Sequence, residues 1–229
     1  MNRLLAKGLS TICITILLAG CLSEPPGNEV SFSTEDGVLL SGRIIGSGEK
    51  SILMSHMDGG SQEDWWEFAQ LLSTYGYSSL TFDFRGYGKS SGNIDKSKLG
   101  IDLQAAVDYT RNTGITKILL LGASMGGTAS ISIASDNDIS GLITLSSPAQ
   151  IAGGLDVTSG IYSIEEPKLF IAAEDDKFHA RSIDLFAQSS INVYEAYKLP
   201  GNKHGTDLFD DESGDKLNGL IIDFLRRNY

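Results

Sequence analysis

The residues with the clearest chemical potential lie in the segment from Gly122 to Gly127, which reads GASMGG. It follows an apolar run from Lys117 to Leu121 and precedes small and apolar residues from Thr128 to Ala134, so a strand, a tight turn and a helix are predicted. A Gly-x-Ser-x-Gly turn between a strand and a helix is a nucleophile elbow, which leaves no room for side chains at the flanking glycines and holds the serine hydroxyl above the sheet edge. The pattern therefore predicts Ser124 as a nucleophile. Because a helix N-terminus favours negative charge, the backbone N–H of Met125 is predicted to supply half of an oxyanion hole.

A serine hydroxyl becomes a good nucleophile only when a base accepts its proton. The chain has three histidines, His56, His179 and His204. His204 lies in the loop GNKHGT between the last predicted strand and the last predicted helix, where the chain order serine, acid, histidine places the base. His179 opens a helix directly after an acidic loop and is predicted to be a surface residue, whereas His56 ends a strand. We therefore predict His204 as the general base.

The base in turn needs a carboxylate that fixes its tautomer and stabilises the imidazolium. The apolar run from Lys168 to Ala173 predicts a buried strand, and Glu174, Asp175 and Asp176 follow it. Only one of these acids can point inward to a histidine. The pattern alone leaves Asp175 and Asp176 as candidates.

The elements that must position these residues follow from apolar runs and helical periodicity along the chain. The predicted strands are 30–34, 38–45, 51–56, 78–83, 117–121, 141–145, 168–173 and 192–198, and the predicted helices are 62–75, 97–112, 128–135, 181–189 and 216–227. The first two strands flank a turn signal and predict an antiparallel hairpin. The remaining alternation predicts an α/β fold with a mostly parallel sheet of about eight strands and helices on both faces. Active sites in such sheets lie beyond the carboxyl ends of the strands, where the candidate residues fall.

Four stretches carry a family resemblance: the elbow, LTFDFRGYGKS at 80–90, LFIAAEDD at 169–176 and HGTD at 204–207. Together they resemble the α/β-hydrolase superfamily, in particular its dienelactone-hydrolase-like and small serine esterase branches, over residues 30–229. The resemblance implies the α/β-hydrolase fold and a serine hydrolase that cleaves esters through an acyl-enzyme, with no cofactor and no metal. Its alignment places Asp176 as the catalytic acid, with Asp175 as the alternative.

The family takes its second oxyanion donor from the loop after the third strand, usually His-Gly-x. Here the loop reads SHMDGG from Ser55 to Gly60, so Met57 stands where glycine is usual. The x position maps to Asp58, whose backbone N–H would pair with that of Met125, and Met57 is the alternative donor. The Asp58 carboxylate would oppose a developing anion if it pointed inward, so we expect it to point outward.

The resemblance also indicates how large a lid covers the active site. Lid domains in this superfamily follow the strand that is predicted to end at Leu145. Only about twenty residues, rich in Gly and Ser, separate Ser146 from Pro167, so we expect an open site with a minimal lid.

Two charged groups are expected to have no catalytic role. Asp83 and Arg85 match a family segment near the site and are predicted to brace a loop as ion-pair residues. The acidic run between residues 207 and 215 does not have the spacing of a calcium loop. We expect it to be the solvated start of a helix.

The amino terminus predicts a leader and an anchor. A basic start is followed by an apolar stretch at residues 12–19, which is too short to span a membrane, and LAGC at 18–21 resembles the lipobox of prokaryotic lipoproteins. This resemblance implies a signal peptide at 1–20, a lipidated Cys21 and a tether at 21–29. We therefore expect an exported protein that is held at the outer side of a membrane by its lipid.

Composition limits the remaining function classes. The chain has 229 residues, enough for one domain with a substantial core. Its formal net charge of −11 and its lack of a basic cluster argue against nucleic acid as a partner. Cys13 lies in the predicted leader and Cys21 would carry the lipid, so no cysteine remains for a disulfide, a metal site or a thiol nucleophile.

The sequence therefore predicts a membrane-tethered serine hydrolase that cleaves carboxylic esters of small substrates with Ser124, His204 and Asp176. One alternative is a serine peptidase of the same fold, although the exopeptidases of the superfamily usually carry an extra gating domain that this chain is too short to hold. The other is a non-catalytic binding lipoprotein on a hydrolase fold, against which the intact serine, acid and histidine argue.

Overall fold

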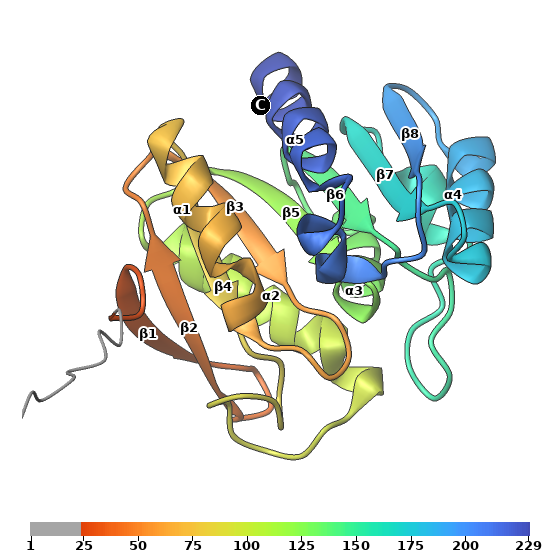
Figure 1. Ribbon diagram of the computed structural model, residues 1–229. Coiled ribbons are helices and arrows are strands. Elements are labelled where there is room, and N and C mark those ends of the chain that lie inside the picture. The colour runs from red at the N-terminus through yellow and green to blue at the C-terminus, as the bar shows by residue number, and fades with distance from the viewer. Residues whose placement is uncertain (1–23) are drawn as a thin grey trace, which may run out of the picture.

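The apolar strands form one eight-stranded sheet in the computed structural model, which describes residues 24–229 (Figure 1). The strands are β1 (Asn28–Ser33), β2 (Leu39–Ile45), β3 (Lys50–Ser55), β4 (Ser78–Phe82), β5 (Lys117–Ala123), β6 (Gly141–Leu145), β7 (Lys168–Ala173) and β8 (Tyr194–Leu199), and they lie in the order β1-β2-β4-β3-β5-β6-β7-β8. β1 and β2 form the predicted antiparallel hairpin, and β2 also runs antiparallel to β4. The strands from β4 across to β8 are parallel. The predicted signal peptide and Cys21 lie outside the described residues.

Five α-helices of the described chain cover the two faces of the sheet: α1 (Trp66–Thr74), α2 (Leu99–Asn112), α3 (Met125–Ala134), α4 (Lys177–Ser189) and α5 (Gly214–Asn228). The apolar side chains of α1 and α5 belong to one buried cluster, and those of α2, α3 and α4 belong to the other. α1 and α5 therefore share one face of the sheet, as Figure 1 also shows. This is the arrangement that the alternation of strands and helices predicts.

The central strands divide their side chains between the two clusters. Along β3, Leu53 packs in the cluster with α2 and α3, while Met54 packs in the cluster with α1 and α5. Leu120 and Leu121 divide in the same way along β5, because successive side chains of a strand point to opposite faces. Both faces are buried, so these strands are apolar throughout, and each large apolar side chain stabilises the fold by about 1.5–3 kcal/mol.

Two boundaries near the site differ from the sequence prediction. β5 continues through Gly122 to Ala123, so the strand reaches the residue before Ser124. α4 begins at Lys177 rather than at residue 181, with Asp176 as its N-cap. In the first turn Phe178 is exposed and only the small Ala180 is buried, so the buried apolar stripe of the helix is weak there.

The expected loop-bracing role is confirmed for Arg85 and Asp83, but the expected ion pair is present only at Arg85. Arg85 Nη1 lies 2.8 Å from Asp36 and Nη2 lies 2.7 Å from the fully buried Asp102. Asp83 has no ion-pair partner among residues 24–229. It accepts hydrogen bonds from the Gln62 backbone and side chain at 2.8 Å each and from the Lys89 N–H at 3.0 Å, so it joins two loops through neutral donors.

The connection from β6 to β7 is short, as expected. It contains one β-bridge between Gln150 and Asp156 and one turn of 3₁₀ helix, η3 (Gly160–Ser163). Ile161 and Ile164 anchor this connection in the core. It holds no inserted helical domain, so the lid is minimal. None of the helices in the described range has the length and apolar character needed to span a membrane.

Candidate active site

The elbow holds Ser124 in a strained backbone conformation at the carboxyl end of β5. Its φ is 50° and its ψ is −118°, a region that costs a non-glycine residue about 1–3 kcal/mol. The flanking glycines are required by space. A Cβ on Gly122 would lie 2.4 Å from the carbonyl carbon of Gly126, and a Cβ on Gly126 would lie 2.3 Å from Ser55 O. The prediction that side chains do not fit at these two positions is confirmed.

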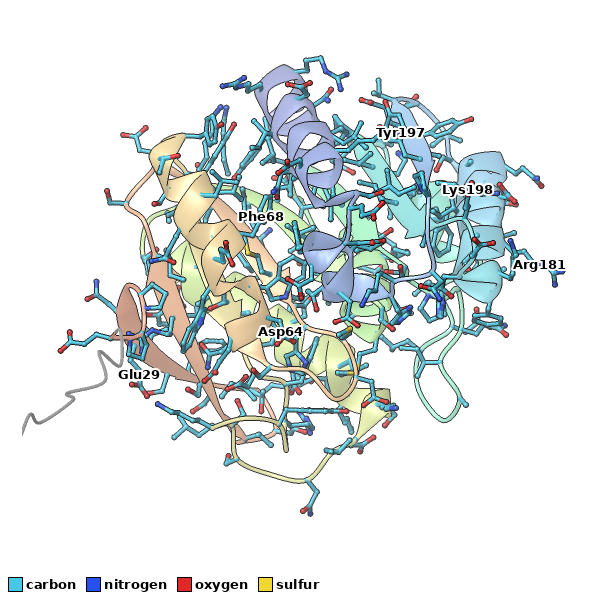
Figure 2. All side chains as sticks on the ribbon, in the orientation of Figure 1. Glu29, Asp64, Phe68, Arg181, Tyr197 and Lys198 are labelled. Carbon is cyan, nitrogen blue, oxygen red and sulfur yellow. The ribbon has the colours of Figure 1, made fainter. Side chains whose placement is uncertain are left out.

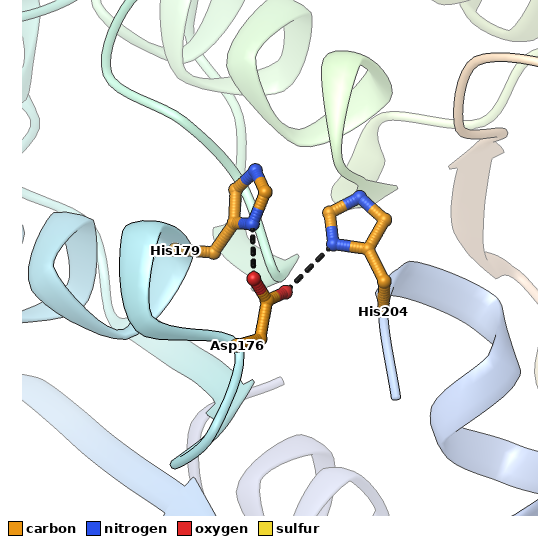
Figure 3. Close-up of side chains that lie close together, drawn as sticks. All are labelled: Asp176, His179 and His204. Atoms are coloured by element: carbon orange, nitrogen blue, oxygen red, sulfur yellow. Dashed lines mark hydrogen bonds and ion pairs between the residues drawn. The ribbon is translucent and has the colours of Figure 1, made fainter. Parts of the chain in front are cut away.

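His204 and Asp176 are in direct contact (Figure 3). Nδ1 of His204 lies 2.7 Å from Oδ2 of Asp176. A carboxylate only accepts hydrogen bonds, so Nδ1 carries the proton and Nε2 keeps a free lone pair. Nε2 has no hydrogen-bond partner among residues 24–229, and the side chain is 33% exposed. This is the tautomer that a general base requires.

His179 is a second imidazole on the same carboxylate. Its Nδ1 lies 2.7 Å from Oδ1 of Asp176, and its ring centroid lies 4.3 Å from that of His204 (Figure 3). The prediction of a simple surface residue is wrong, because the early start of α4 turns the His179 side chain back toward the helix N-cap. Its side chain is 19% exposed.

The contacts between Asp176 and the two histidines change the pKa values of Asp176 and His179. Burial raises the pKa of Asp176, but hydrogen bonds from His179 and His204 outweigh it, and the net pKa is below the usual value. Burial lowers the pKa of His179, and the nearby charge of His204 lowers it further, against the opposing effect of Asp176. The group therefore favours an ionised carboxylate beside a neutral His179.

Asp175, the alternative acid, faces away from both histidines. Its Oδ1 pairs with Lys177 Nζ at 2.5 Å, and both side chains are exposed. Of the two candidates, the structure brings only Asp176 to His204.

The histidine loop packs against the elbow. A Cβ on Gly205, the residue after His204, would lie 3.5 Å from the Ala123 Cβ. Ala123 immediately precedes Ser124, so Ser124 and His204 lie on adjoining segments. No hydrogen bond within residues 24–229 involves Ser124 Oγ, so no structural partner holds the hydroxyl.

His56 fixes the direction of one peptide in the loop after β3. It is fully buried, its Nε2 accepts the Phe84 N–H at 3.0 Å, and its Nδ1 donates to Met57 O at 2.7 Å. Gly60 N–H donates to the same carbonyl at 3.2 Å. The peptide bonds are trans, so the Asp58 N–H points opposite to the Met57 carbonyl, away from the His56 ring. Burial lowers the pKa of His56 and keeps it neutral in this role.

The carboxylate of Asp58 is held by two side chains. It accepts a hydrogen bond from the Tyr87 hydroxyl at 2.6 Å and pairs with Lys96. The bond from Lys96, followed by that from Tyr87, lowers the pKa of Asp58. The carboxylate is thus committed to Tyr87 and Lys96, while the backbone N–H of Asp58 has no hydrogen-bond partner among the described residues.

Comparison with known proteins identifies the family. A family profile for the α/β hydrolase fold matches residues 51–158. The chain is 30% identical to the protein bem46 of Schizosaccharomyces pombe, over 87% of this chain and 76% of that protein. The chain belongs to the α/β-hydrolase family. This hydrolase is also 26% identical to YfhR of Escherichia coli, over 86% of this chain and 79% of that protein. Its fold matches an esterase of Pyrococcus furiosus with a TM-score of 0.73 at 21% identity, over 87% of this chain and 90% of that one.

In this hydrolase, sequence reasoning missed His179 as a member of the site. The signal that could have revealed it is its spacing of three residues from Asp176, which places two side chains on one face of a helical turn. The two histidines and Asp176 are also the one group in the described chain with three ligand atoms close enough for a metal, within 4.8 Å of one another. Both carboxylate oxygens already accept an imidazole N–H, so this donor set fits a hydrogen-bonded acid–base group better than a metal site.

Proposed function

We propose that this α/β hydrolase is a serine hydrolase of carboxylic esters of small molecules. The observation that carries the proposal is the His204–Asp176 contact on a loop that packs against the strained Ser124 elbow. A free serine hydroxyl, an imidazole with a free Nε2 and an ionised carboxylate are the three groups that acyl transfer requires.

In the proposed reaction, Ser124 Oγ attacks the ester carbonyl carbon while His204 Nε2 takes the hydroxyl proton. The resulting oxyanion collapses, the bond to the alcohol oxygen breaks, and His204 returns the proton to the leaving alcohol. A water molecule then attacks the acyl-serine with the same proton transfers, which releases the acid and restores Ser124. Asp176 holds His204 in the required tautomer and stabilises its charged form.

The oxyanion would be bound by two backbone N–H groups, those of Met125 and Asp58. Met125 begins α3, where the first N–H groups have no partner within the helix. The Asp58 N–H is supported as the second donor because His56 fixes the direction of its peptide before substrate arrives. Donors fixed in advance stabilise a developing charge without a cost of reorganisation.

The test is labelling of the purified chain with a fluorophosphonate probe, followed by peptide mass spectrometry, beside a series of p-nitrophenyl esters of increasing acyl length. We expect one adduct, on Ser124, and ester turnover that is lost in Ser124→Ala. Ser132→Ala, about two turns further along α3, is the matched control. A folded chain that gives no adduct and no turnover would reject the proposal and favour the non-catalytic binding protein. Cleavage of peptide p-nitroanilides, assayed alongside, would favour the peptidase.

A further inference from the structure

A pocket of about 430 Å³ lies beside the catalytic group, between α1 and the 3₁₀ helix η4 (Gly205–Asp210). We call it the α1–η4 pocket. Met57 lines the pocket. The Met57 side chain also packs against Gly205 of the histidine loop, since a Cβ on Gly205 would lie 2.7 Å from its sulfur. Thr206, two residues after His204, lines it as well. The pocket therefore shares its wall with the loops that carry the base and the proposed oxyanion donor.

Apolar side chains form part of this pocket. Phe68 of α1 and Phe209 of η4 both line it, with ring centroids 4.8 Å apart, and Leu71 lines it from the next turn of α1. Figure 2 labels Phe68 and Asp64 on the segment that packs against η4. An occupant with an apolar stem of a few carbons would find contact there.

Every charged side chain that lines the pocket is acidic: Asp64, Glu67, Asp207 and Asp210. Asp64 is engaged at its own helix start, where it accepts the Ser61 N–H. Within residues 24–229, the carboxylates of Glu67, Asp207 and Asp210 have neither an ion-pair partner nor a hydrogen-bond donor. Three free negative charges therefore surround the pocket of a protein whose net charge is already −11.

Two buried oxygens in the pocket wall also lack partners. Thr206 is 6% exposed, and its Oγ1 is buried without a hydrogen bond in the described chain. Asn218, from α5, also lines the pocket, and its Oδ1 is buried and unpaired as well. An unpaired buried oxygen is unfavourable, so the wall beside the three carboxylates holds two further oxygens whose capacity to accept a hydrogen bond is unused.

The chemistry of the occupant follows from these observations. Carboxylates and an amide oxygen only accept hydrogen bonds, so the occupant must donate them and carry positive charge. A bare divalent cation is excluded, because among residues 24–229 the ligand atoms of three acidic or histidine side chains come within 4.8 Å of one another only at Asp176. An organic cation can instead place its head among separated carboxylates and its stem on the aromatic rings.

We propose that the α1–η4 pocket binds an alkylammonium or alkylguanidinium group. Given the proposed ester hydrolysis, on which this second step rests, the group belongs to the substrate and lies beside the ester at Ser124. The substrate class is then an ester with a cationic side arm.

The binding test uses the full chain with Ser124→Ala and a ligand-observed NMR titration of butylammonium, with butanol as the neutral probe. We expect butylammonium to bind about tenfold more tightly than butanol, from three exposed charge pairs of modest strength each, and to weaken as salt increases. The triple variant Glu67→Gln, Asp207→Asn, Asp210→Asn should lose this preference. Glu63→Gln, an exposed acid outside the pocket lining, should keep it.

Equal binding of the two probes, or a preference that survives the triple variant, would overturn the inference. Thermal unfolding of each variant verifies that the fold is intact. The substrate step is tested by the ratio of kcat/KM for p-nitrophenyl 4-guanidinobutyrate to that for p-nitrophenyl pentanoate. The triple variant should lower this ratio, and Glu63→Gln should keep it. Butylammonium binding in a chain that no fluorophosphonate labels would reject the ester hydrolysis and keep the cation site.

Discussion

Replacing Asp176 by asparagine tests the acid–base group at its centre. Asp176 accepts one imidazole N–H on each oxygen, from His179 and His204, at 2.7 Å each. Asparagine offers one acceptor and one donor, so it can keep only one of the two histidines in its present tautomer. Where the amide NH₂ faces His204, the proton of that ring moves to Nε2, and the ring can no longer act as the base.

The size of the effect follows from the position of the pair. The side chains of His204 and Asp176 are 33% and 13% exposed, so the pair lies near the protein surface. Two unit charges about 4 Å apart attract by about 4 kcal/mol in such surroundings. The loss of this attraction to the imidazolium in the transition state lowers kcat by about 10³-fold. The loss of the correct tautomer in part of the population adds to this.

The assay is kcat for the best p-nitrophenyl ester at pH 7.5, with Asp175→Asn as the matched control. Asp175 is exposed and contacts only Lys177 through its side chain, so its variant should stay within about twofold of the wild type. Activity of Asp176→Asn within tenfold of the wild type would refute the reasoning. So would an equal loss in Asp175→Asn, because the two acids would then be equivalent.

Two further predictions follow from the same structure, and a third follows from the sequence. His179→Ala removes a hydrogen bond that lowers the pKa of Asp176, so the acid limb of the kcat/KM profile should move to higher pH, and an unmoved limb would contradict this. Burial lowers the pKa of His56 below its usual value of 6.5, so the unfolded state binds more protons than the folded state between the two pKa values. The contribution of His56 to the free energy of unfolding should therefore be fully present above pH 6.5 and decrease as the pH falls below it. His56→Asn should show a smaller decrease between pH 7 and 5 in denaturant titrations. Finally, Cys21→Ser should abolish fatty-acid labelling of the chain expressed in a bacterium and move it to the aqueous phase of a detergent partition.

Local patterns were enough to predict the fold and the strained turn at Ser124. The strands 141–145 and 168–173 have the predicted bounds, because runs that are buried on both faces are apolar from end to end. The elbow was predictable because two glycines are needed where a Cβ would meet backbone atoms. Both signals act over a few residues and do not depend on distant parts of the chain.

The contacts of His204 and Asp176 could not be predicted from the periodicity of apolar residues, because they depend on the three-dimensional positions of two loops. A run of three acids gave no local reason to choose Asp176, because the choice depends on where α4 begins and which way its N-cap turns. The same helix start brings His179 onto the carboxylate. The spacing of three residues between Asp176 and His179 becomes informative only when the helix is known to begin at Lys177.

The departure at Met57 illustrates how the oxyanion loop tolerates a side chain where the family usually has glycine. Its carbonyl is fixed by the buried His56 and by Gly60 N–H, which sets the direction of the next N–H without regard to the side chain at position 57. The side chain finds room because residue 205 is glycine: its φ is 58°, and a Cβ there would lie 2.7 Å from the Met57 sulfur. Glycine at 205 is favoured by its positive φ, and it leaves the Met57 sulfur in place. Met57 also lines the α1–η4 pocket. Its side chain therefore lies between the proposed oxyanion loop, the histidine loop and the wall of the proposed cation site.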